Sequence, residues 1–486
     1  MSDADRRQSQ PHQIPPRSRG TAEHHAERSY VFRQIILPAQ RFIHTEVLSG
    51  VVLLVAAVGA LVWANSPWDE EYFDLFGTVL SVDAGVFHIE EDLHGWINDG
   101  LMTFFFFVVG LEIKREMTRG ELAGFQKAIL PVVAALGGMV APALVYTALN
   151  AGGEGQDGWG IPMATDIAFA LGVLALVGRG VPAPLRIFLL ALAIADDIGA
   201  ILVIAVFYTS DLSAESLAIA VGLLAVVYGM NRAGVRDFTL YLLVGGFVWV
   251  AMHESGVHAT IAGVALGLMT PADPYYSPET FDEAMADLLA KYKDAQARED
   301  EAAAQHVLGQ IESLSLGTES PLERLERLLH PMTSFIVIPV FALANAGVII
   351  TGDTVSDAVS SEVSQGVVFG LVLGKPLGIF LATWLAVRVG LAQLPRTMTW
   401  AHVLGVGLLG GIGFTVALFI DELAFDAEVL VNDGKMGILA GSLVSAVVGY
   451  VILVLLARPP TEPQPGTSEP AYPTSLMRTG RSSRYE

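Results

Sequence analysis

The chain has 486 residues, of which 52% are hydrophobic and only 16% are charged, and its mean hydropathy is +0.52. Soluble domains carry about 25% charged residues, so this composition excludes an ordinary soluble fold and indicates a membrane protein. The sequence has no cysteine, which excludes a disulfide framework, a cysteine zinc site and thiol chemistry. The net charge of −22 does not indicate a basic partner, because much of it lies in one segment, 271–329.

Between the charged segments run repeated apolar stretches of about 20 residues, the length that crosses the hydrocarbon core of a bilayer. They predict an all-α polytopic membrane protein with about twelve transmembrane helices, of which the eighth is short enough to tilt or stop inside the membrane. The predicted helices span 44–64, 96–117, 127–149, 162–178, 184–209, 213–230, 237–254, 257–270, 331–350, 365–387, 399–420 and 435–457.

The positions of lysine and arginine in the short loops predict the orientation of these helices. The loops 66–95, 150–161, 210–213 and 351–364 contain neither residue, and on their side only Lys435 occurs, at the start of the last helix. Because basic loops stay in the cytoplasm, both ends of the chain are expected there. The basic loops follow predicted helices 2, 4, 6 and 10 and hold Lys114, Arg115, Arg119, Lys127, Arg179, Arg186, Arg232, Arg236, Arg388 and Arg396.

The two ends of the chain differ in composition from the part between them. Residues 1–40 are rich in Arg, Gln, Pro and His and have no apolar core of a signal peptide, so they are expected to form a disordered cytoplasmic arm. Residues 458–486 are rich in Pro, Ser and Thr and are expected to form a disordered cytoplasmic tail. The transmembrane domain is therefore predicted at 41–457.

Two connecting segments stand out from the short loops. The outer loop 66–95 holds two short apolar runs on either side of the turn-like Asp83-Ala84-Gly85, which predicts a β-hairpin. An exposed two-stranded hairpin is marginal alone and favours edge pairing with a second copy. The acidic insert 271–329 is predicted to face the cytoplasm, and its stretch 281–316 has a helical composition. Either an amphipathic surface helix or a mobile segment fits it, and a solvated insert is favoured over a regulatory element.

The fourth and eleventh predicted helices each contain an interruption. Helix 4 begins with Pro162, Thr165 and Asp166, and a proline removes a backbone donor. Irregular backbone at membrane depth is tolerated where it lines a cavity, although an N-cap near the membrane edge would also explain Thr165 and Asp166. Helix 11 is interrupted by the Gly-Gly-Ile-Gly-Phe-Thr string at 410–415. The two helices are the middle members of triplets 3–5 and 10–12, which run in opposite senses, and paired broken helices in inverted halves indicate a transporter binding site.

Two adjacent acids, Asp196 and Asp197, lie in the middle of the fifth predicted helix. A charged side chain near the bilayer centre costs about 2.5–3.5 kcal/mol on insertion scales, so such residues usually face a polar cavity and are functional. Successive residues on a helix project about 100° apart, so the two acids cannot point at the same spot. Lys375, alone within the tenth helix, is the expected partner of one of them. A structural ion pair would explain that acid and Lys375, and it leaves the other acid to bind a cation or a proton.

The same acids suit an alkali cation, which prefers oxygen ligands. Carboxylates of Asp166, Asp196 and Asp197, the Thr165 hydroxyl and unwound backbone carbonyls could supply them. A carboxylate that releases a proton to take a metal ion, and the reverse, exchanges the two by competition when access alternates between the two sides. The residues therefore predict ion or proton transport, with no cofactor beside the transported ions and no enzymatic activity.

Seven ordered strings between residues 44 and 457 resemble the NhaA-type sodium/proton antiporter family of bacterial inner membranes. That family is known for paired broken helices in inverted repeats, so the resemblance and the pattern above are not independent. The strings are Gly-Leu-Glu-Ile-Lys-Arg-Glu at 110–116, Ala-Thr-Asp-Ile-Ala-Phe-Ala-Leu-Gly at 164–172, Ala-Leu-Ala-Ile-Ala-Asp-Asp-Ile-Gly-Ala-Ile at 191–201, Ser-Gly-Val-His-Ala-Thr at 255–260, Pro-Val-Phe-Ala-Leu-Ala-Asn-Ala-Gly at 339–347, Gly-Lys-Pro-Leu-Gly at 374–378 and Gly-Ile-Gly-Phe-Thr at 411–415.

The resemblance implies pH-regulated exchange of Na⁺ or Li⁺ for protons, with alternating access and net charge movement. It implies that Asp197 is the main cation and proton carrier and that Asp196 pairs with Lys375. It also implies that Thr165 and Asp166 belong to a crossing of the broken helices. There Asp166 would offset the positive helix ends and Lys375 the negative ends. A homodimer through the outer hairpin is implied as well.

Four further residues match family positions tied to the pH response. They are Glu112 and Glu116 at the inner end of helix 2, His258 at the start of helix 8, and Glu326 before helix 9. Pairing along a helix, a structural or capping histidine, and an ordinary surface charge would explain the same residues. Asp99 matches a family acid to which no firm role is assigned.

Other classes of protein stay open from the residues alone. A cation-coupled symporter for an organic anion would need a further anion partner, and only Lys375 lies deep in the membrane. An intramembrane aspartyl protease needs two aspartates that face each other from separate helices, a geometry that only Asp166 with Asp197 would mimic. A passive channel would show uncoupled flux. The acidic insert, the long N-terminal arm and Glu254 depart from the family pattern, and they bear on regulation more than on transport.

Overall fold

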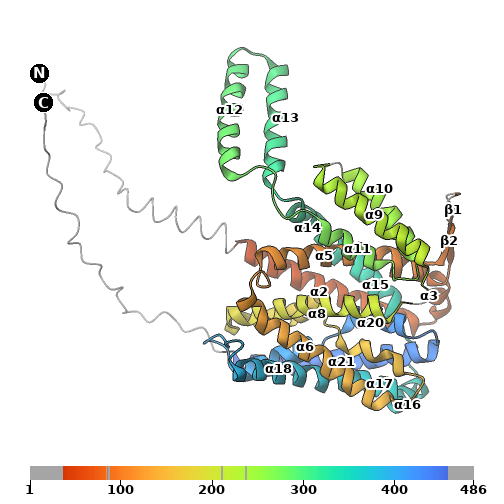
Figure 1. Ribbon diagram of the computed structural model, residues 1–486. Helices are drawn as coiled ribbons and strands as arrows, with labels where there is room; N and C mark the ends of the chain where they lie inside the picture. Colours follow the sequence, from red (N-terminus) through yellow and green to blue (C-terminus); the bar gives the residue numbers. More distant parts are fainter. Residues whose placement is uncertain (1–36, 84, 86–87, 210–211, 236–237, 458–486) are drawn as a thin grey trace, which may run out of the picture.

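The computed structural model describes residues 37–83, 85, 88–209, 212–235 and 238–457. The arm predicted at 1–40 lies outside these residues except for its last four, which begin a helix, and the tail predicted at 458–486 lies outside them entirely. The described chain is a bundle of helices with one small sheet (Figure 1). In chain order its elements are α2 (Leu37–Ala64), α3 (Asp69–Phe76), β1 (Val79–Asp83), β2 (His88–Asp92), α4 (Leu93–Gly95), the π-helical η2 (Trp96–Leu101), α5 (Met102–Arg119), α6 (Phe125–Asn150), the 3-10 helix η3 (Gln156–Met163), α7 (Ile167–Val177), the 3-10 helix η4 (Gly178–Gly180), α8 (Ala183–Phe207), α9 (Ala214–Arg232), α10 (Phe238–His253), α11 (Thr260–Met269), α12 (Pro278–Ala297), α13 (Glu301–Thr318), α14 (Pro321–Met332), the π-helical η5 (Thr333–Val337), α15 (Ile338–Asn345), α16 (Gly352–Ser360), α17 (Glu362–Phe369), the π-helical η6 (Gly370–Gly374), α18 (Lys375–Val389), α19 (Trp400–Gly410), α20 (Phe414–Ala424) and α21 (Glu428–Leu456).

Within the described residues, eight helical segments are long and apolar enough to cross a membrane, and up to ten if each of two bent pairs is one span. The bent pairs are α2 with α3, at 117°, and α19 with α20, at 48°. Two more apolar helices, α10 and α11, are shorter. The prediction of a polytopic helical membrane protein is confirmed, and the number of about twelve spans stays a prediction.

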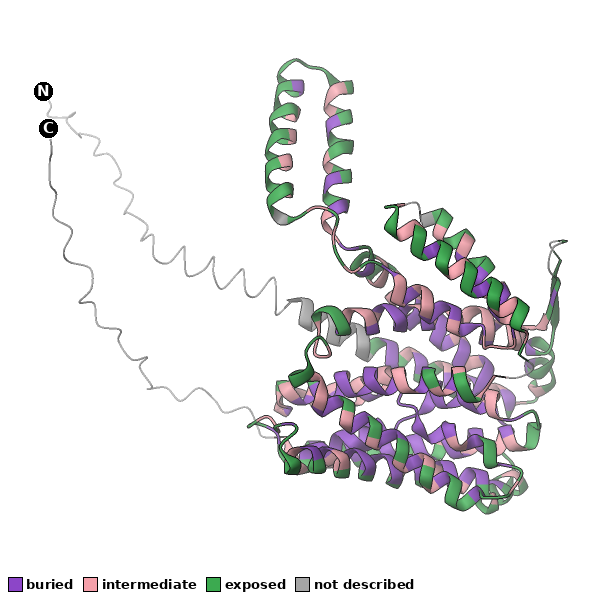
Figure 2. Cartoon of the chain, viewed as in Figure 1, coloured by how far each residue is buried: buried purple, intermediate pink, exposed green. Residues whose placement is uncertain are grey.

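The outward faces of the bundle are apolar. Leu54 and Val58 on α2, and Leu443, Val447 and Val451 on α21, are exposed, while small and apolar side chains fill the interior (Figure 2). Apolar faces this extensive indicate contact with lipid in a protein that otherwise packs normally. Following the charge-based orientation, we refer to the end of the bundle that carries Arg119 as the inner end and to the end that carries β1 and β2 as the outer end.

The outer loop contains the predicted hairpin. β1 pairs antiparallel with β2, so that Val79 lies opposite Asp92 and Asp83 lies opposite His88. The apolar run before it is not extended, because it forms α3, whose first turn is acidic as the positive end of a helix favours. Tyr72 of α3 is buried, and its hydroxyl donates to Leu343 O at 2.8 Å. The short helix therefore belongs to the bundle, and only the hairpin extends from it.

The stretch 281–316 of the acidic insert lies in two helices rather than one. α12 and α13 pack against each other and stand clear of the bundle (Figure 1). The chain reverses between them at Glu299, whose φ is 57°, a left-handed value that ends one helix before the next begins. Asp300 then caps α13 by accepting from Ala303 N at 2.9 Å. α14 returns the chain to the inner end of the bundle.

Candidate functional site

Two interrupted helices cross in the middle of the bundle. Residues 164–166 separate η3 from α7, and residues 411–413 separate α19 from α20. The two breaks are joined directly, since Asp166 N donates to Ile412 O at 2.7 Å and the Thr165 hydroxyl donates to Gly410 O at 2.8 Å. The interruptions predicted at 161–166 and 410–415 are therefore present and side by side. The inverted relation of the two triplets stays a prediction.

Asp166 holds the start of both outgoing helices. Its Oδ1 accepts from Phe169 N at 3.0 Å, and its Oδ2 accepts from Thr415 N at 3.2 Å and from the Thr415 hydroxyl at 2.6 Å. The carboxylate thus satisfies amides at the N-terminal ends of α7 and α20, where helix dipoles are positive. Asp166 is an N-cap, as one interpretation of the sequence had it, but it lies in the interior with 2% of its surface exposed.

Lys375 and Asp196 form a fully buried ion pair. Lys375 begins α18 directly after the π-helical turn η6, and its Nζ donates to Asp196 Oδ2 at 2.7 Å. The same ammonium donates to the carbonyl of Met163, the last residue of η3. A buried pair persists only where each charge is well satisfied, and here the lysine also meets the negative end of a short helix. Asp196 Oδ1 is buried and accepts no hydrogen bond of normal geometry from the described residues.

Asp197 lies beside this pair without a fixed partner. It is 7% exposed, and no described residue forms a hydrogen bond or ion pair with its carboxylate. The charges that act on it are those of Asp196 and Glu112 first, then Lys375 and Asp166. The residues described contain no group of three or more histidines, cysteines or acids placed to hold a metal ion.

Three of the four predicted pH-response residues lie together at the inner end. Arg115 donates to Glu326 and lies 3.5 Å from Glu116 Oε1, while Glu116 Oε2 accepts from Glu121 N at 2.9 Å. Glu112 lies one turn before Glu116 on α5, close enough for its charge to act on Asp197. The inner cluster therefore connects α5, α14 and, through Glu112, the buried acids.

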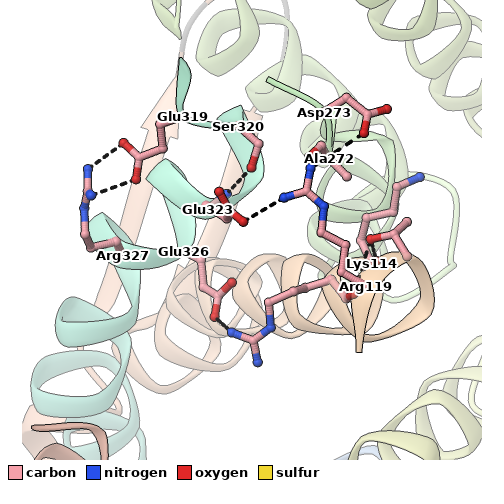
Figure 3. Close-up of polar contacts among 11 residues, drawn as sticks. Lys114, Arg119, Ala272, Asp273, Glu319, Ser320, Glu323, Glu326 and Arg327 are labelled. Carbon is pink, nitrogen blue, oxygen red and sulfur yellow. Dashed lines mark hydrogen bonds and ion pairs between the residues drawn. The ribbon is translucent and has the colours of Figure 1, made fainter. Parts of the chain in front are cut away.

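Arg119 connects the base of the insert to the same end of α5, a contact that the sequence does not predict. Its Nη1 lies 2.8 Å from Glu323 Oε1, and its Nη2 lies 3.6 Å from Asp273 Oδ1 and donates to Ala272 O at 2.6 Å (Figure 3). Sequence alone explained this arginine by the positive-inside rule, which says nothing about its partners.

His258 lies at the other end of the molecule. Its Nδ1 is 3.5 Å from Asp99 Oδ1, and the second oxygen of Asp99 is 3.5 Å from Nδ1 of His253. Burial lowers the pKa of His258, and the charge of Asp99 opposes this shift. Asp99 precedes Glu116 by 17 positions on η2 and α5, about 25 Å along the helix axis, so the four predicted residues form two groups and not one.

Another buried acid was not singled out from the sequence. Asp421 on α20 has no exposed surface, and neither carboxylate oxygen has a hydrogen-bond partner among the described residues. The eleventh helix predicted from the sequence ends at 420, which leaves this acid in the outer loop that follows. Only the extension of the helix to Ala424 places it in the interior.

The bundle has lipid-facing sides and carries buried charged residues where two interrupted helices cross. These features define a multi-pass membrane protein with ionisable groups in its interior. The profile of the family described as Na+/H+ antiporter 1 matches residues 40–453. The chain therefore belongs to the Na+/H+ antiporter 1 family, and the resemblance found in the seven strings is confirmed.

Curated relatives agree with this assignment over nearly their whole length. The Na(+)/H(+) antiporter NhaA of Rhodopirellula baltica is 47% identical over 426 residues, which cover 87% of this chain and 95% of that one. The Na(+)/H(+) antiporter NhaA 2 of Sorangium cellulosum is 48% identical over 431 residues, covering 88% and 92%. The Na(+)/H(+) antiporter NhaA 1 of Saccharophagus degradans is 45% identical over 428 residues, covering 87% and 92%.

Proposed function

We propose that this protein exchanges Na⁺ or Li⁺ for protons across the bacterial cytoplasmic membrane, with both chain ends in the cytoplasm. One observation carries the proposal: Lys375 holds Asp196 at 2.7 Å, while the adjacent, 7% exposed Asp197 has no bonded partner within the described chain. A buried carboxylate without a fixed partner is the group that a proton or an alkali cation can occupy in turn. The names of the relatives above support sodium and protons as the pair of ions.

The exchange follows from competition at Asp197. In one half of the cycle the carboxylate carries a proton, and in the other it carries the cation, with Asp196 and the Thr165 hydroxyl as further oxygens. Access alternates between the two membrane faces through movement at the helix crossing, where Asp166 and Lys375 keep opposite helix ends compensated. Exchange is electrogenic if the cation displaces more than one proton, and the Asp196–Lys375 pair offers the second titratable position.

The remaining groups serve regulation and assembly in this proposal. Glu112, Glu116 and Glu326 respond to pH at the inner end and His258 at the outer end, with Asp99 as an accessory acid. Such an exchanger would support pH homeostasis and salt tolerance.

Two copies are proposed to pair through the outer hairpin, whose first strand is exposed along its whole length. Val82→Pro disturbs β1 where Val82 lies opposite Ile89 and should weaken dimers in cross-linking of membranes. Exchange per protomer should persist. Loss of exchange by a folded monomeric variant would contradict an assembly role.

The decisive experiment uses everted vesicles from a host that lacks its own antiporters. The vesicles are energised to acidify the lumen, and Na⁺, Li⁺ or K⁺ is added at several pH values while a ΔpH dye is followed. We expect dequenching by Na⁺ or Li⁺ but not by K⁺, and none in Asp197→Asn. Asp353→Asn, an exposed acid on α16, is the matched control and should behave as wild type.

Wild-type exchange by a well-inserted Asp197→Asn variant would remove the central claim. Absence of dequenching at any pH in the wild type would direct the search to a cation-coupled symporter, with labelled organic anions as the next substrates.

A further inference from the structure

A second pair of adjacent acids lies on α20, outside the exchange site proposed above. Glu422 forms an ion pair with Lys435, whose Nζ lies 2.6 Å from Glu422 Oε1. His94 Nε2 lies 3.7 Å from the same oxygen. Its neighbour Asp421 is completely buried, with both oxygens unpartnered in the part of the chain that the structure describes. Lys435 therefore pairs with the partly exposed Glu422 and not with the buried Asp421.

The protein leaves room for this carboxylate. A Cβ built on Gly434 of α21 would lie 1.8 Å from Asp421 Oδ1 and 3.0 Å from Oδ2, so no larger residue fits at 434 while Asp421 keeps its place. The carboxylate is packed against a backbone and not against a donor. Glycine at this position is required by the acid that faces it.

The polar groups near Asp421 form their hydrogen bonds and ion pairs with other residues. The charges that act on it are those of Lys435, Glu422 and Asp433. The hydroxyl of Tyr146 on α6 donates to Gly155 O at 2.7 Å. The hydroxyl of Tyr208, the residue directly after α8, donates to Asp157 O at 2.7 Å. No side chain among these supplies the hydrogen bond that a buried carboxylate needs.

A buried acid without donors is costly as a bare anion, so a positive partner must accompany it when the site is closed. The position of Asp421 along α20 indicates which cation can reach it. Asp421 follows Thr415 by six residues on α20, about 9 Å along the axis from the hydroxyl that holds Asp166. Beyond it, toward the outer end, come the partly exposed Glu422 and Lys435. Asp421 thus lies between the helix crossing and the outer surface.

We propose that Asp421 is a second binding position for the small monovalent cation that this protein moves, Na⁺ or H⁺, on the outer side of the helix crossing. This inference rests on the proposed exchange function. An ion that leaves Asp197 toward the outer side would meet the carboxylate of Asp421 before it reaches the Lys435–Glu422 pair.

Infrared difference spectroscopy on the reconstituted full-length protein tests whether Asp421 binds an ion. The probes are Na⁺ alone at fixed pH and a pH change without Na⁺. We expect a protonated-carboxyl C=O band that is lost in Asp421→Asn and displaced in Asp421→Glu. A band that Na⁺ removes shows that Na⁺ displaces the proton there, and a band that only pH removes identifies the proton as the bound cation. An Asp421 signal that responds to neither would overturn the proposal.

Transport by proteoliposomes gives the second readout. Asp421→Asn should still exchange but need a several-fold higher Na⁺ concentration for half-maximal rate, or show a displaced pH profile, and Asp421→Glu should restore much of the loss. Asp426→Asn, an exposed acid five positions away, is the control for charge and should change neither. An unchanged Na⁺ requirement and pH profile in folded Asp421→Asn would count against the proposal.

Two further variants separate the possible causes. Gly434→Ala places a methyl group where Asp421 Oδ1 lies and should reproduce the effect of Asp421→Asn. If it folds poorly, the double variant Asp421→Ala/Gly434→Ala removes the clash and should show the same Na⁺ requirement. Asp197→Asn is measured beside them, because exchange retained there would contradict the proposed function whatever Asp421 does.

Discussion

The bundle contains two pairs of adjacent acids, each with one lysine partner, and the two pairs differ in which acid is the more deeply buried. On α8 the adjacent acids are Asp196 and Asp197, and on α20 they are Asp421 and Glu422. In each pair a lysine from another helix takes one acid, Lys375 at 2.7 Å in the centre and Lys435 at 2.6 Å toward the outer end. Neighbours on a helix project about 100° apart, so one lysine reaches only one of the two.

The two lysines differ in how fully they are enclosed. Lys375 and Asp196 have 0% and 1% of their side chains exposed, whereas Lys435 and Glu422 keep 10% and 18%. In the centre the charged pair is the buried structural element and the acid beside it is slightly open. Toward the outer end the ion pair is partly exposed and the adjacent acid, Asp421, is fully buried. In both places, then, the lysine forms an ion pair with one carboxylate and leaves the adjacent carboxylate without an ion pair.

The largest expected effect comes from removing the central lysine. Lys375→Met keeps the volume but leaves Asp196 buried and unpaired, which should cost about 3–5 kcal/mol of stability and abolish exchange. Thermal unfolding of the detergent-solubilised protein measures the loss. The double variant Lys375→Met/Asp196→Asn removes the stranded charge and should recover much of the stability. No recovery would show that the lysine acts through Met163 or packing and not through Asp196.

A smaller effect is expected where the acid has several donors. Thr415→Val keeps the shape of the side chain and removes the 2.6 Å bond to Asp166 Oδ2, while the bonds from Phe169 N and Thr415 N remain. A lost bond to a buried charged group costs about 1–3 kcal/mol. We expect lower stability and slower exchange with an unchanged preference among cations. A loss as large as that of Lys375→Met would mean that the hydroxyl has a role beyond this bond.

Removing the outer lysine should cost less than either. Lys435→Met leaves Glu422 with partial access to water and with His94 at 3.7 Å, so the penalty should be about 1 kcal/mol. The same unfolding measurement applies, with Lys291→Met in the exposed α12 pair as the control. A loss equal to that of the central lysine would erase the difference between the two pairs.

The central pair was within reach of sequence reasoning and the outer one was not, for a physical reason. An acid or a lysine in the middle of a long apolar run is conspicuous, which is how Asp196, Asp197 and Lys375 were found. Asp421 lies near the end of its helix, where a charged residue is ordinary. Its burial depends on α21 offering Gly434 at that level, and such a contact between helices has no local signature in the sequence.

The same limit explains the other differences. Helix breaks at 161–166 and 410–415 follow from local proline and glycine, so they were predictable, and so was the β-hairpin around Asp83. The run at 72–76 became a helix because buried contacts with α15 decided between two local possibilities. The number of spans is hardest to predict, because short helices such as α10 and α11 are apolar without reaching the length of a full crossing.

A third acid sharpens the comparison, because Asp99 has histidines as its partners and not a lysine. Burial lowers the pKa of His258 below its ordinary value of about 6.5. As pH falls, the unfolded chain therefore takes up a proton at this position before the folded protein does, and stability should fall with it below about pH 6.5.

His258→Gln cannot titrate, so its unfolding temperature should change less between neutral and mildly acidic pH than that of the wild type. His306→Gln, on the exposed face of α13, should leave the wild-type slope intact. A wild type that gains stability on acidification relative to His258→Gln would show that the charge of Asp99 outweighs burial, and the outer acid would then resemble the lysine-held acids after all.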